Sequence, residues 1–473
     1  TSSGIINSHP AIKAASPQAP VSDWFIGDDM HHNGAFFLAQ NYDFFAGFGQ
    51  PRPKPETPET TKNKEFDFGT KDGYKFFKDT MGSLANSDDL YRKNVGTDIA
   101  FWNQMMAHPN YDQFWKDRNI LTKLKNIKCA VMTVGGWYDN EDLYGALETY
   151  KSIEANNPGI YNVLVVGPWY HGGWARSDGE WLGTAYFGQK TGAYYREKLE
   201  LPFFNHYLKE KGDLGDLKEI NVFDTGANKW AFYDKPVTGT EKIFYLQADG
   251  KLSPDAPMKD RSSFDEYVSD PSKPVPYTKK ITINYPRDFM TEDQRFVSNR
   301  SDVLTYQTEV LTEDVTVAGD IKPTLFASTS GTDSDYVVKL IDVFPDDAEF
   351  PKDLKLTPEA SNGFELSGYQ MLLRGEPFRA RFRNSFEKPE PMEANRIAKI
   401  VYTMPAIEHT FKKGHRIMVQ IQSSWFPLVD RNPQTYVPNI FEAKEIDFKK
   451  ATQRIYRNGA NPSSVALRII PTK

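Results

Sequence analysis

Residues 131–173, VMTVGGWYDNEDLYGALETYKSIEANNPGIYNVLVVGPWYHGG, decide the fold of this chain. Two apolar runs, at 129–134 and 161–166, enclose a stretch whose apolar residues recur at helical spacing. This order of strand, helix and strand predicts a right-handed parallel crossover. The loops that follow the two strands then open at the same edge of the sheet, where ligands bind in open α/β sheets.

The two loops carry an acid and a histidine. Asp139 follows the first strand and His171 follows the second, which is the order of acid and base in an α/β-hydrolase triad. His171 would accept the proton of a serine hydroxyl, and Asp139 would fix the imidazole tautomer. Alternatively, Asp139 is an ordinary helix N-cap, with Asp142 three residues later as an imperfect capping box. Spacing alone favours neither interpretation of Asp139, whereas glycines follow His171 and no helix face requires it.

The acid and histidine segments, GGWYDNEDLYGA and GPWYHGGW, resemble those of the α-amino acid ester hydrolases. That family includes the glutaryl-cephalosporin acylases and, more distantly, cocaine esterase and the X-Pro dipeptidyl peptidases. The resemblance covers nearly the whole chain. It is also carried by GDD at 27–29, YVSDPSKPVP at 267–276, DQRF at 293–296, DSDYVVKLID at 333–342 and QSSWFPLVDRNPQ at 422–434.

The resemblance implies a set of substrate-binding residues. Asp29, Glu141 and Asp142 match the carboxylate cluster that receives the α-ammonium group of the substrate in this family. Acids gathered at one point repel each other and raise some of their pKa values, and a bound cation relieves that repulsion. Trp137 and Tyr138, in the acid segment, are also expected to contact the substrate. Without the resemblance, adjacent carboxylates such as those at 28–29 are more often a solvated turn.

The nucleophile motif of the family, Gly-x-Ser-Tyr-x-Gly, does not occur in this sequence. Family spacing would place it a few residues before Thr1. Neither Ser2 nor Ser3 is expected to replace it, because no strand precedes them and no elbow glycines flank them. We therefore expect a C-terminal portion of a longer serine hydrolase, inactive alone, whose partner is the missing N-terminal hydrolase segment.

The expected fold is a partial α/β-hydrolase domain with a helical cap insertion, followed by a C-terminal jelly-roll β-sandwich. We assign residues 1–34 and 123–216 to the hydrolase core, 35–122 to the cap and 217–473 to the jelly roll. After residue 216 the pattern changes to short strand-like runs without long helices between them, which is typical of a β-sandwich. Asp249-Gly250, between Leu246 and Leu252, is a strong hairpin signal.

Composition excludes several classes of protein. Lys and Arg number 57 against 63 Asp and Glu, so the formal net charge is −6, which argues against a nucleic-acid partner. No apolar run approaches the ~18 residues that a membrane span needs. His31 and His32 have no suitably spaced Cys or Glu partner for a metal, so we predict neither a metal nor a cofactor. The single cysteine, Cys129, permits no intrachain disulfide.

Two alternatives to the amino-ester hydrolase stay open. One is a general carboxylesterase or glutaryl-type acylase that does not require an α-amine. The other is a non-catalytic remnant whose β-sandwich resembles carbohydrate-binding domains in shape, which rests on fold analogy alone. Both the amino-ester hydrolase and the general esterase or acylase would act on a small-molecule ester or amide. The sequence leaves a homo-oligomer open, and the resemblance to a bacterial family implies an exported or periplasmic protein.

Overall fold

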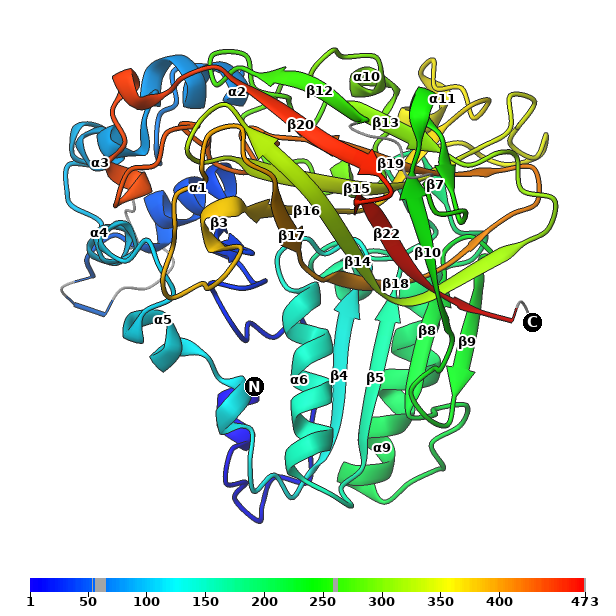
Figure 1. The fold of residues 1–473 in the computed structure, drawn as a ribbon. Coiled ribbons are helices and arrows are strands. Elements are labelled where there is room, and N and C mark those ends of the chain that lie inside the picture. Colours follow the sequence, from blue (N-terminus) through cyan, green and yellow to red (C-terminus); the bar gives the residue numbers. More distant parts are fainter. Residues whose placement is uncertain (53, 56–64, 258–262, 472–473) are drawn as a thin grey trace.

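The computed structural model describes residues 1–52, 54–55, 65–257 and 263–471 (Figure 1). A five-stranded sheet occupies the lower part of the view, and the larger sheets of the C-terminal half lie above it. Helices of residues 38–118 lie to the left of these sheets. No helix among the described residues is both long and apolar enough to cross a lipid bilayer.

The five-stranded sheet has the order β1-β4-β5-β8-β9. Its strands are β1 (Ala14–Ala15), β4 (Ala130–Gly136), β5 (Asn162–Gly167), β8 (Ile220–Asp224) and β9 (Lys229–Tyr233). The first four are parallel, and β9 returns antiparallel to β8. Helix α6 (Leu143–Asn156) joins β4 to β5, so the predicted parallel crossover is confirmed. Every residue of β4 and β5 is buried, as expected for strands covered on both faces.

The two faces of this sheet pack against different helices. On one face, Leu143 and Leu147 of α6 share a core with Leu164 and Val166. On the other, Met132 and Val165 pack with residues of the helical segment that follows His171. That segment comprises α7 (Gly173–Arg176), α8 (Thr191–Tyr194), a π-helical stretch (Tyr195–Glu200) and α9 (Leu201–Lys209). The alternation of β5 side chains between these two cores fixes the crossover in place.

A helical segment follows the first loop of the sheet. It contains α1 (Leu38–Phe48), α2 (Gly73–Lys75), α3 (Ser87–Val95), α4 (Ala100–Ala107) and α5 (Gln113–Arg118). Aromatic residues such as Tyr42, Tyr91 and Trp102 form its core, and Phe426 and Phe441 of the C-terminal half complete that core. The helices are therefore packed onto the C-terminal half of the chain.

The C-terminal half is a β domain of two large sheets. The nine-stranded sheet contains β10 (Thr240–Leu246), β11 (Leu252–Ser253), β12 (Phe264–Ser269), β14 (Val315–Thr329), β17 (Ala398–Val401), β18 (Met404–Phe411), β20 (Ala451–Asn458), β21 (Asn461–Pro462) and β22 (Ser464–Ile470). The four-stranded sheet contains β13 (Leu304–Gln307), β15 (Asp335–Val343), β16 (Gln370–Arg379) and β19 (Arg416–Gln422). Leu246 pairs with Leu252 across the turn at Asp249-Gly250, which confirms the predicted hairpin.

One hydrophobic core joins the β domain to the five-stranded sheet. Tyr138, Leu164 and Val222 of the sheet region share it with Val338 and Leu372 of the β domain. Short elements complete the description: β2 (His31–His32), β3 (Ala35–Phe36), β6 (Trp181–Leu182), β7 (Ala185–Tyr186), α10 (Arg295–Ser298) and α11 (Pro358–Ser361). The loop after β4 therefore lies between the sheet and the β domain.

Candidate active site

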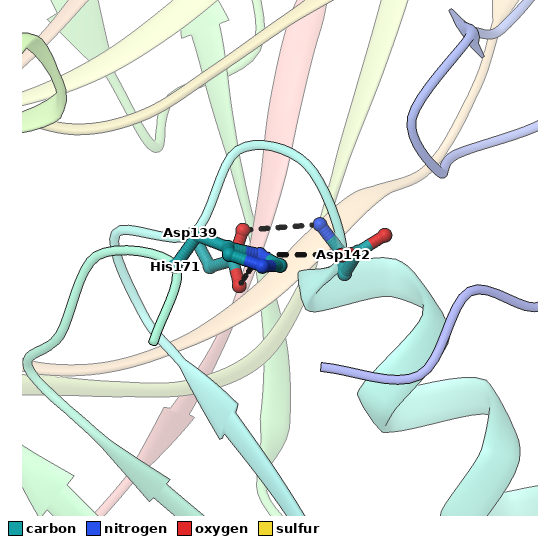
Figure 2. Close-up of side chains that lie close together, drawn as sticks. All are labelled: Asp139, Asp142 and His171. Atoms are coloured by element: carbon teal, nitrogen blue, oxygen red, sulfur yellow. Dashed lines mark hydrogen bonds and ion pairs between the residues drawn. The ribbon is translucent and has the colours of Figure 1, made fainter. Parts of the chain in front are cut away.

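Asp139 and His171 lie side by side at the carboxyl edge of the five-stranded sheet (Figure 2). Nδ1 of His171 is 3.2 Å from Oδ2 of Asp139, 3.3 Å from Oδ2 of Asp142 and 3.6 Å from Oε2 of Glu141. Within the described residues, Nδ1 makes a straight hydrogen bond to none of the three. The Asp139 side chain is fully buried, whereas that of His171 is 37% exposed. Because Nδ1 faces the acids, Nε2 is the ring nitrogen left to face another group.

The loops that carry this pair approach each other closely. The N–H groups of Trp137 and Tyr138 donate to the carbonyls of Gly167 and Trp169, at 2.8 and 3.0 Å. A Cβ atom on Gly136 would lie 2.2 Å from the Trp169 carbonyl oxygen. Only glycine fits at this position, and its small size lets the acid loop and the histidine loop share backbone hydrogen bonds.

Asp139 stabilises the turn that leads into helix α6. Its Oδ1 accepts the N–H groups of Glu141 and Asp142, at 3.0 and 3.1 Å. The N-cap of α6 is Asp142, not Asp139. The capping alternative is therefore half right: Asp139 orders the first turn through one oxygen, and its second oxygen faces His171.

Asp28 and Asp29 take different roles in the loop after β1. The carboxylate of Asp28 accepts hydrogen bonds from Ser22 and Asp23 and from the N–H of Gly145 in α6, and burial raises its pKa to about 8. The loop and the helix touch here, because a Cβ on Gly145 would lie 1.9 Å from the carbonyl oxygen of Pro20. Asp28 thus anchors the loop, and Asp29 is held near Glu141, whose carbonyl accepts the Asp29 N–H at 3.1 Å.

Burial dominates the electrostatics of the acid cluster. It raises the pKa of Asp29 to about 6 and that of Glu141 to about 7, and repulsion from Asp139 adds to both shifts. Burial also raises the pKa of Asp142, and repulsion from Asp29 is the second-largest cause of that rise. For His171, burial alone would lower the pKa, but Asp139 and Asp142 outweigh it and hold the pKa well above its usual range. The cluster therefore attracts protons or another cation.

Two overlapping sets of side chains could hold a cation: Asp139, Asp142 and His171, and Asp29, Glu141 and Asp142. Within each set the ligand atoms lie within 4.8 Å of one another. Carboxylate oxygens suit both an ammonium group and a hard divalent cation. The structure thus brings together all three acids that the sequence assigned to ammonium binding, beside the predicted base.

A cavity of about 450 Å³ opens onto this cluster. Its polar side includes Asp29, Glu141, Asp142 and His171, and its apolar side includes Met30, Phe44 and Ile283. Among the described residues, no serine, threonine or cysteine lines it. The cavity therefore joins the predicted base, His171, to the carboxylates predicted to bind a cation.

Two residues of the cavity wall were missed in the sequence. The amide oxygen of Gln40 and the hydroxyl of Tyr285 are buried, and neither has a hydrogen-bond partner within the part of the chain that the structure describes. Tyr285 comes from the β domain and lies against Phe289. No local motif marks either residue, because each reaches the cavity through the packing of a distant segment.

Trp137 and Tyr138, predicted to contact the substrate, lie in the core instead. They are 4% and 2% exposed, and neither lines the cavity. The indole N–H of Trp137 donates to the carbonyl of Phe223 at 2.8 Å. Their side chains point between the sheet and the β domain, where they hold the loop that carries Asp139.

Two family models match the chain. The model described as X-Pro dipeptidyl-peptidase (S15 family) matches residues 2–173. The model described as X-Pro dipeptidyl-peptidase C-terminal non-catalytic domain matches residues 215–466, which is more than half of the chain.

Individual proteins give the same result. The chain is 30% identical over 380 residues to the cocaine esterase of Rhodococcus sp. (strain MB1 Bresler), a match that covers 78% of this chain and 61% of the esterase. It superposes with a TM-score of 0.88 on an aminopeptidase from a marine sediment archaeon, Thaumarchaeota archaeon, at 38% identity over 99% of this chain and 74% of that one. An α-amino acid ester hydrolase also gives 0.88, at 36% identity over 98% of this chain and 74% of that one. The chain spans about three fifths of the curated relatives that it matches. With more than half of its length matched by one family model, the chain belongs to the X-Pro dipeptidyl-peptidase-like family, to which cocaine esterase and the α-amino acid ester hydrolase are also related.

Proposed function

We propose that the protein is a serine hydrolase that forms an acyl-enzyme with esters or acyl amides, including β-lactam acyl amides, of α-amino acids. One observation carries this proposal: His171, whose Nδ1 lies 3.2 Å from Oδ2 of Asp139, lines the same cavity as Asp29, Glu141 and Asp142. The arrangement pairs a base with an orienting acid and sets both beside a receptor for a cation. The relatives named as an α-amino acid ester hydrolase and an aminopeptidase support a substrate that bears a free amine.

In this mechanism, Nε2 of His171 takes the proton of a serine hydroxyl as the oxygen attacks the substrate carbonyl carbon. The imidazolium is stabilised through Nδ1 by the Asp139 carboxylate. His171 then returns the proton to the leaving alcohol or amine as its bond to the carbonyl carbon breaks. Water, deprotonated by the same imidazole, hydrolyses the acyl-enzyme and restores the serine.

The α-ammonium of the substrate would sit among Asp29, Glu141 and Asp142. Each of these carboxylates is buried enough for its pKa to be raised, so a cation that joins them relieves both desolvation and mutual repulsion. The apolar side of the cavity, at Met30, Phe44 and Ile283, would receive the side chain of the acyl group. Substrates with an apolar side chain and a free α-amine are therefore favoured.

We also propose that the nucleophile comes from outside this chain, and that the chain alone is inactive. No serine, threonine or cysteine side chain lines the cavity among the described residues, and the sequence has no nucleophile elbow. In this proposal, residues 1–34 and 123–216 form part of the hydrolase core, and residues 35–122 form a cap. The β domain at 217–473 would be a jelly roll.

The test is hydrolysis of phenylglycine methyl ester by the natural full-length protein and by this chain alone. We expect turnover by the full-length protein, its loss in His171→Ala, and none by this chain. Turnover by this chain that disappears in His171→Ala would overturn the external nucleophile, and a full-length protein that leaves the ester intact would overturn the proposed function.

A general carboxylesterase is the second candidate. The match to a protein named cocaine esterase and the apolar side of the cavity favour ester hydrolysis without a requirement for an α-amine. The two candidates differ in the role of Glu141, because only an amino ester needs its charge. A Glu141→Gln variant that loses both ester classes equally would support the general esterase.

A further inference from the structure

Arg374 of strand β16 is a buried cation beneath the loop that carries Asp139. The residue is 1% exposed. Its Nη2 donates to the carbonyl oxygen of Trp137 at 2.7 Å and lies 3.4 Å from the carbonyl oxygen of Ala406. Its Nε is buried without a hydrogen-bond partner among the described residues. The guanidinium thus reaches from the β domain into the active-site loop of the sheet.

Two other buried arginines of the β domain show how unusual this is. Arg379 contacts Asp335 and Asp430 at 2.8 and 2.6 Å, and Arg381 contacts Asp333 at 2.6 Å. Arg374 makes no ion pair within the described residues. Since burying a cation without a paired carboxylate is costly, its retention here calls for a role that a neutral side chain would not fill.

The local backbone directs Arg374 toward the loop. Arg374 pairs with Leu340 in β15, and the register between β15 and β16 shifts at the next residue pair, Ile341 with Leu372. Such a bulge re-aims the side chains beside it. The buried charge is attracted to Glu376, Tyr138 and Asp139, which oppose the lowering of the Arg374 pKa by burial.

We propose that Arg374 is a positioning residue: it anchors the Trp137 carbonyl and places a buried positive charge beneath the loop that holds Asp139 against His171. This inference rests on the proposed function. It gives the β domain, whose family model is described as non-catalytic, a direct part in arranging the catalytic pair. The loop also keeps hydrogen bonds to Gly167, Trp169 and Phe223, so removing Arg374 should alter the electrostatics and orientation of the acid rather than unfold the loop.

The test compares Arg374→Met, Arg374→Lys and the control Arg416→Met in the natural full-length protein. Arg416, on strand β19, is a suitable control, because its guanidinium also donates to a backbone carbonyl, that of Thr308, at 2.8 Å. With phenylglycine methyl ester, Arg374→Met should lower kcat about tenfold or more with KM within about twofold, since the acid acts on the transition state. Arg374→Lys should recover part of kcat, and Arg416→Met should leave both constants unchanged.

The pH profile separates positioning from simple destabilisation. Loss of a nearby positive charge raises the pKa of His171, so the acid limb of kcat should move to higher pH by about half a unit or more in Arg374→Met. The proposal would be overturned if Arg374→Met left the acid limb or the value of kcat unchanged, or if Arg416→Met changed them as much.

A second measurement does not depend on activity. The imidazole resonances of His171 are assigned in this chain by comparison with His171→Ala and titrated by NMR. Arg374→Met should raise the midpoint of this titration more than Arg374→Lys does, while Arg416→Met should leave it unchanged. The inference is overturned if neither substitution of Arg374 changes the midpoint of the His171 titration. If the midpoint changes with Arg374 but the protein hydrolyses no ester, the proposed function is wrong, whereas the effect of the Arg374 charge on His171 is supported.

Discussion

The carboxylate of Asp142 lies 3.3 Å from Nδ1 of His171, almost as close as that of Asp139 at 3.2 Å. A residue that we propose for ammonium binding therefore also contacts the proposed general base. A substrate ammonium at Asp142 neutralises part of the negative charge that holds a proton on the imidazole. In the proposed function, binding of the amine and the protonation of His171 are thus linked through one side chain.

This linkage predicts different pH profiles for two matched substrates, phenylglycine methyl ester and methyl phenylacetate. The pKa of His171 is raised by Asp139 and Asp142 despite burial, and a bound ammonium opposes that rise. The acid limb of kcat should therefore lie at lower pH for the amino ester than for methyl phenylacetate. Titration of the amine itself affects only the basic limb. Superimposed acid limbs, or the reverse order, would argue against the linkage.

Asp139→Asn should lower kcat by about 10³-fold or more with little change in KM, because the amide leaves the loop geometry intact but no longer stabilises the imidazolium. Steady-state kinetics on the natural full-length protein measure this effect. Asp178→Asn is the control, since the Asp178 side chain is half-exposed and contacts Lys190, at 3.5 Å, and the N–H of Glu180, at 3.2 Å. Equal activity of the two variants would remove Asp139 from the mechanism.

Glu141→Gln should distinguish amino esters from other esters. The charge of Glu141 faces the ammonium site, so we expect kcat/KM for phenylglycine methyl ester to fall about tenfold or more, and that for methyl phenylacetate to change by less than about threefold. Competition of the two esters in one reaction, followed by chromatography, gives the ratio directly. A ratio that stays at the wild-type value would favour the general carboxylesterase.

Asp29→Asn should stabilise the protein at high pH. Burial raises the Asp29 pKa to about 6 from an ordinary value of 3.8, so the folded state binds this proton more tightly than the unfolded state. The wild type thus loses stability as pH rises from about 4 to about 6, and asparagine avoids that loss. Thermal unfolding should show a Tm about 1–3 °C above wild type at pH 8 and no difference near pH 4.

The neighbouring substitution, Asp28→Asn, should destabilise the protein near pH 4, where Asp29→Asn has no effect. The Asp28 carboxylate accepts hydrogen bonds from Ser22, Asp23 and Gly145, and an amide nitrogen cannot accept them. We expect Tm to fall by several degrees, on the order of the loss of one or two buried hydrogen bonds. Similar behaviour of the two variants would contradict the separate roles that we assign to this pair.

Gly136→Ala should separate the acid and histidine loops. The added Cβ would lie 2.2 Å from the Trp169 carbonyl oxygen, a clash that costs about 2–4 kcal/mol unless the loops move apart. We predict lower stability in denaturant unfolding and a fall in kcat. In helix α1, a Cβ added by Gly47→Ala would meet no atom of the described residues within 4 Å, so this substitution should be neutral or slightly stabilising. If Gly136→Ala lowers neither the stability nor kcat, the close approach of the two loops is not required for either.

Local patterns in the sequence predicted the elements that short-range rules govern. The crossover at 131–173 and the hairpin between Leu246 and Leu252 both depend on neighbouring residues, and both are confirmed. Asp139 and His171 meet because parallel strands place their following loops at one edge. The approach of Asp29 depends on the same edge, since β1 pairs with β4 in parallel.

Contacts that depend on the stacking of the β domain could not be predicted in this way. Tyr285 and Arg374 reach the site from segments far along the chain, and their positions follow from the packing of the β domain and from the shift in register between β15 and β16. Trp137 and Tyr138 point into the core for the same reason. The β domain covers the side of the loop that an isolated sheet would expose.

The most direct test of the central claim is covalent labelling of the natural full-length protein with a fluorophosphonate, followed by peptide mass spectrometry. We predict one labelled serine, outside the 473 residues of this chain, and loss of labelling in both His171→Ala and Asp139→Asn. A label on a serine of this chain, or labelling that persists without His171, would contradict the account.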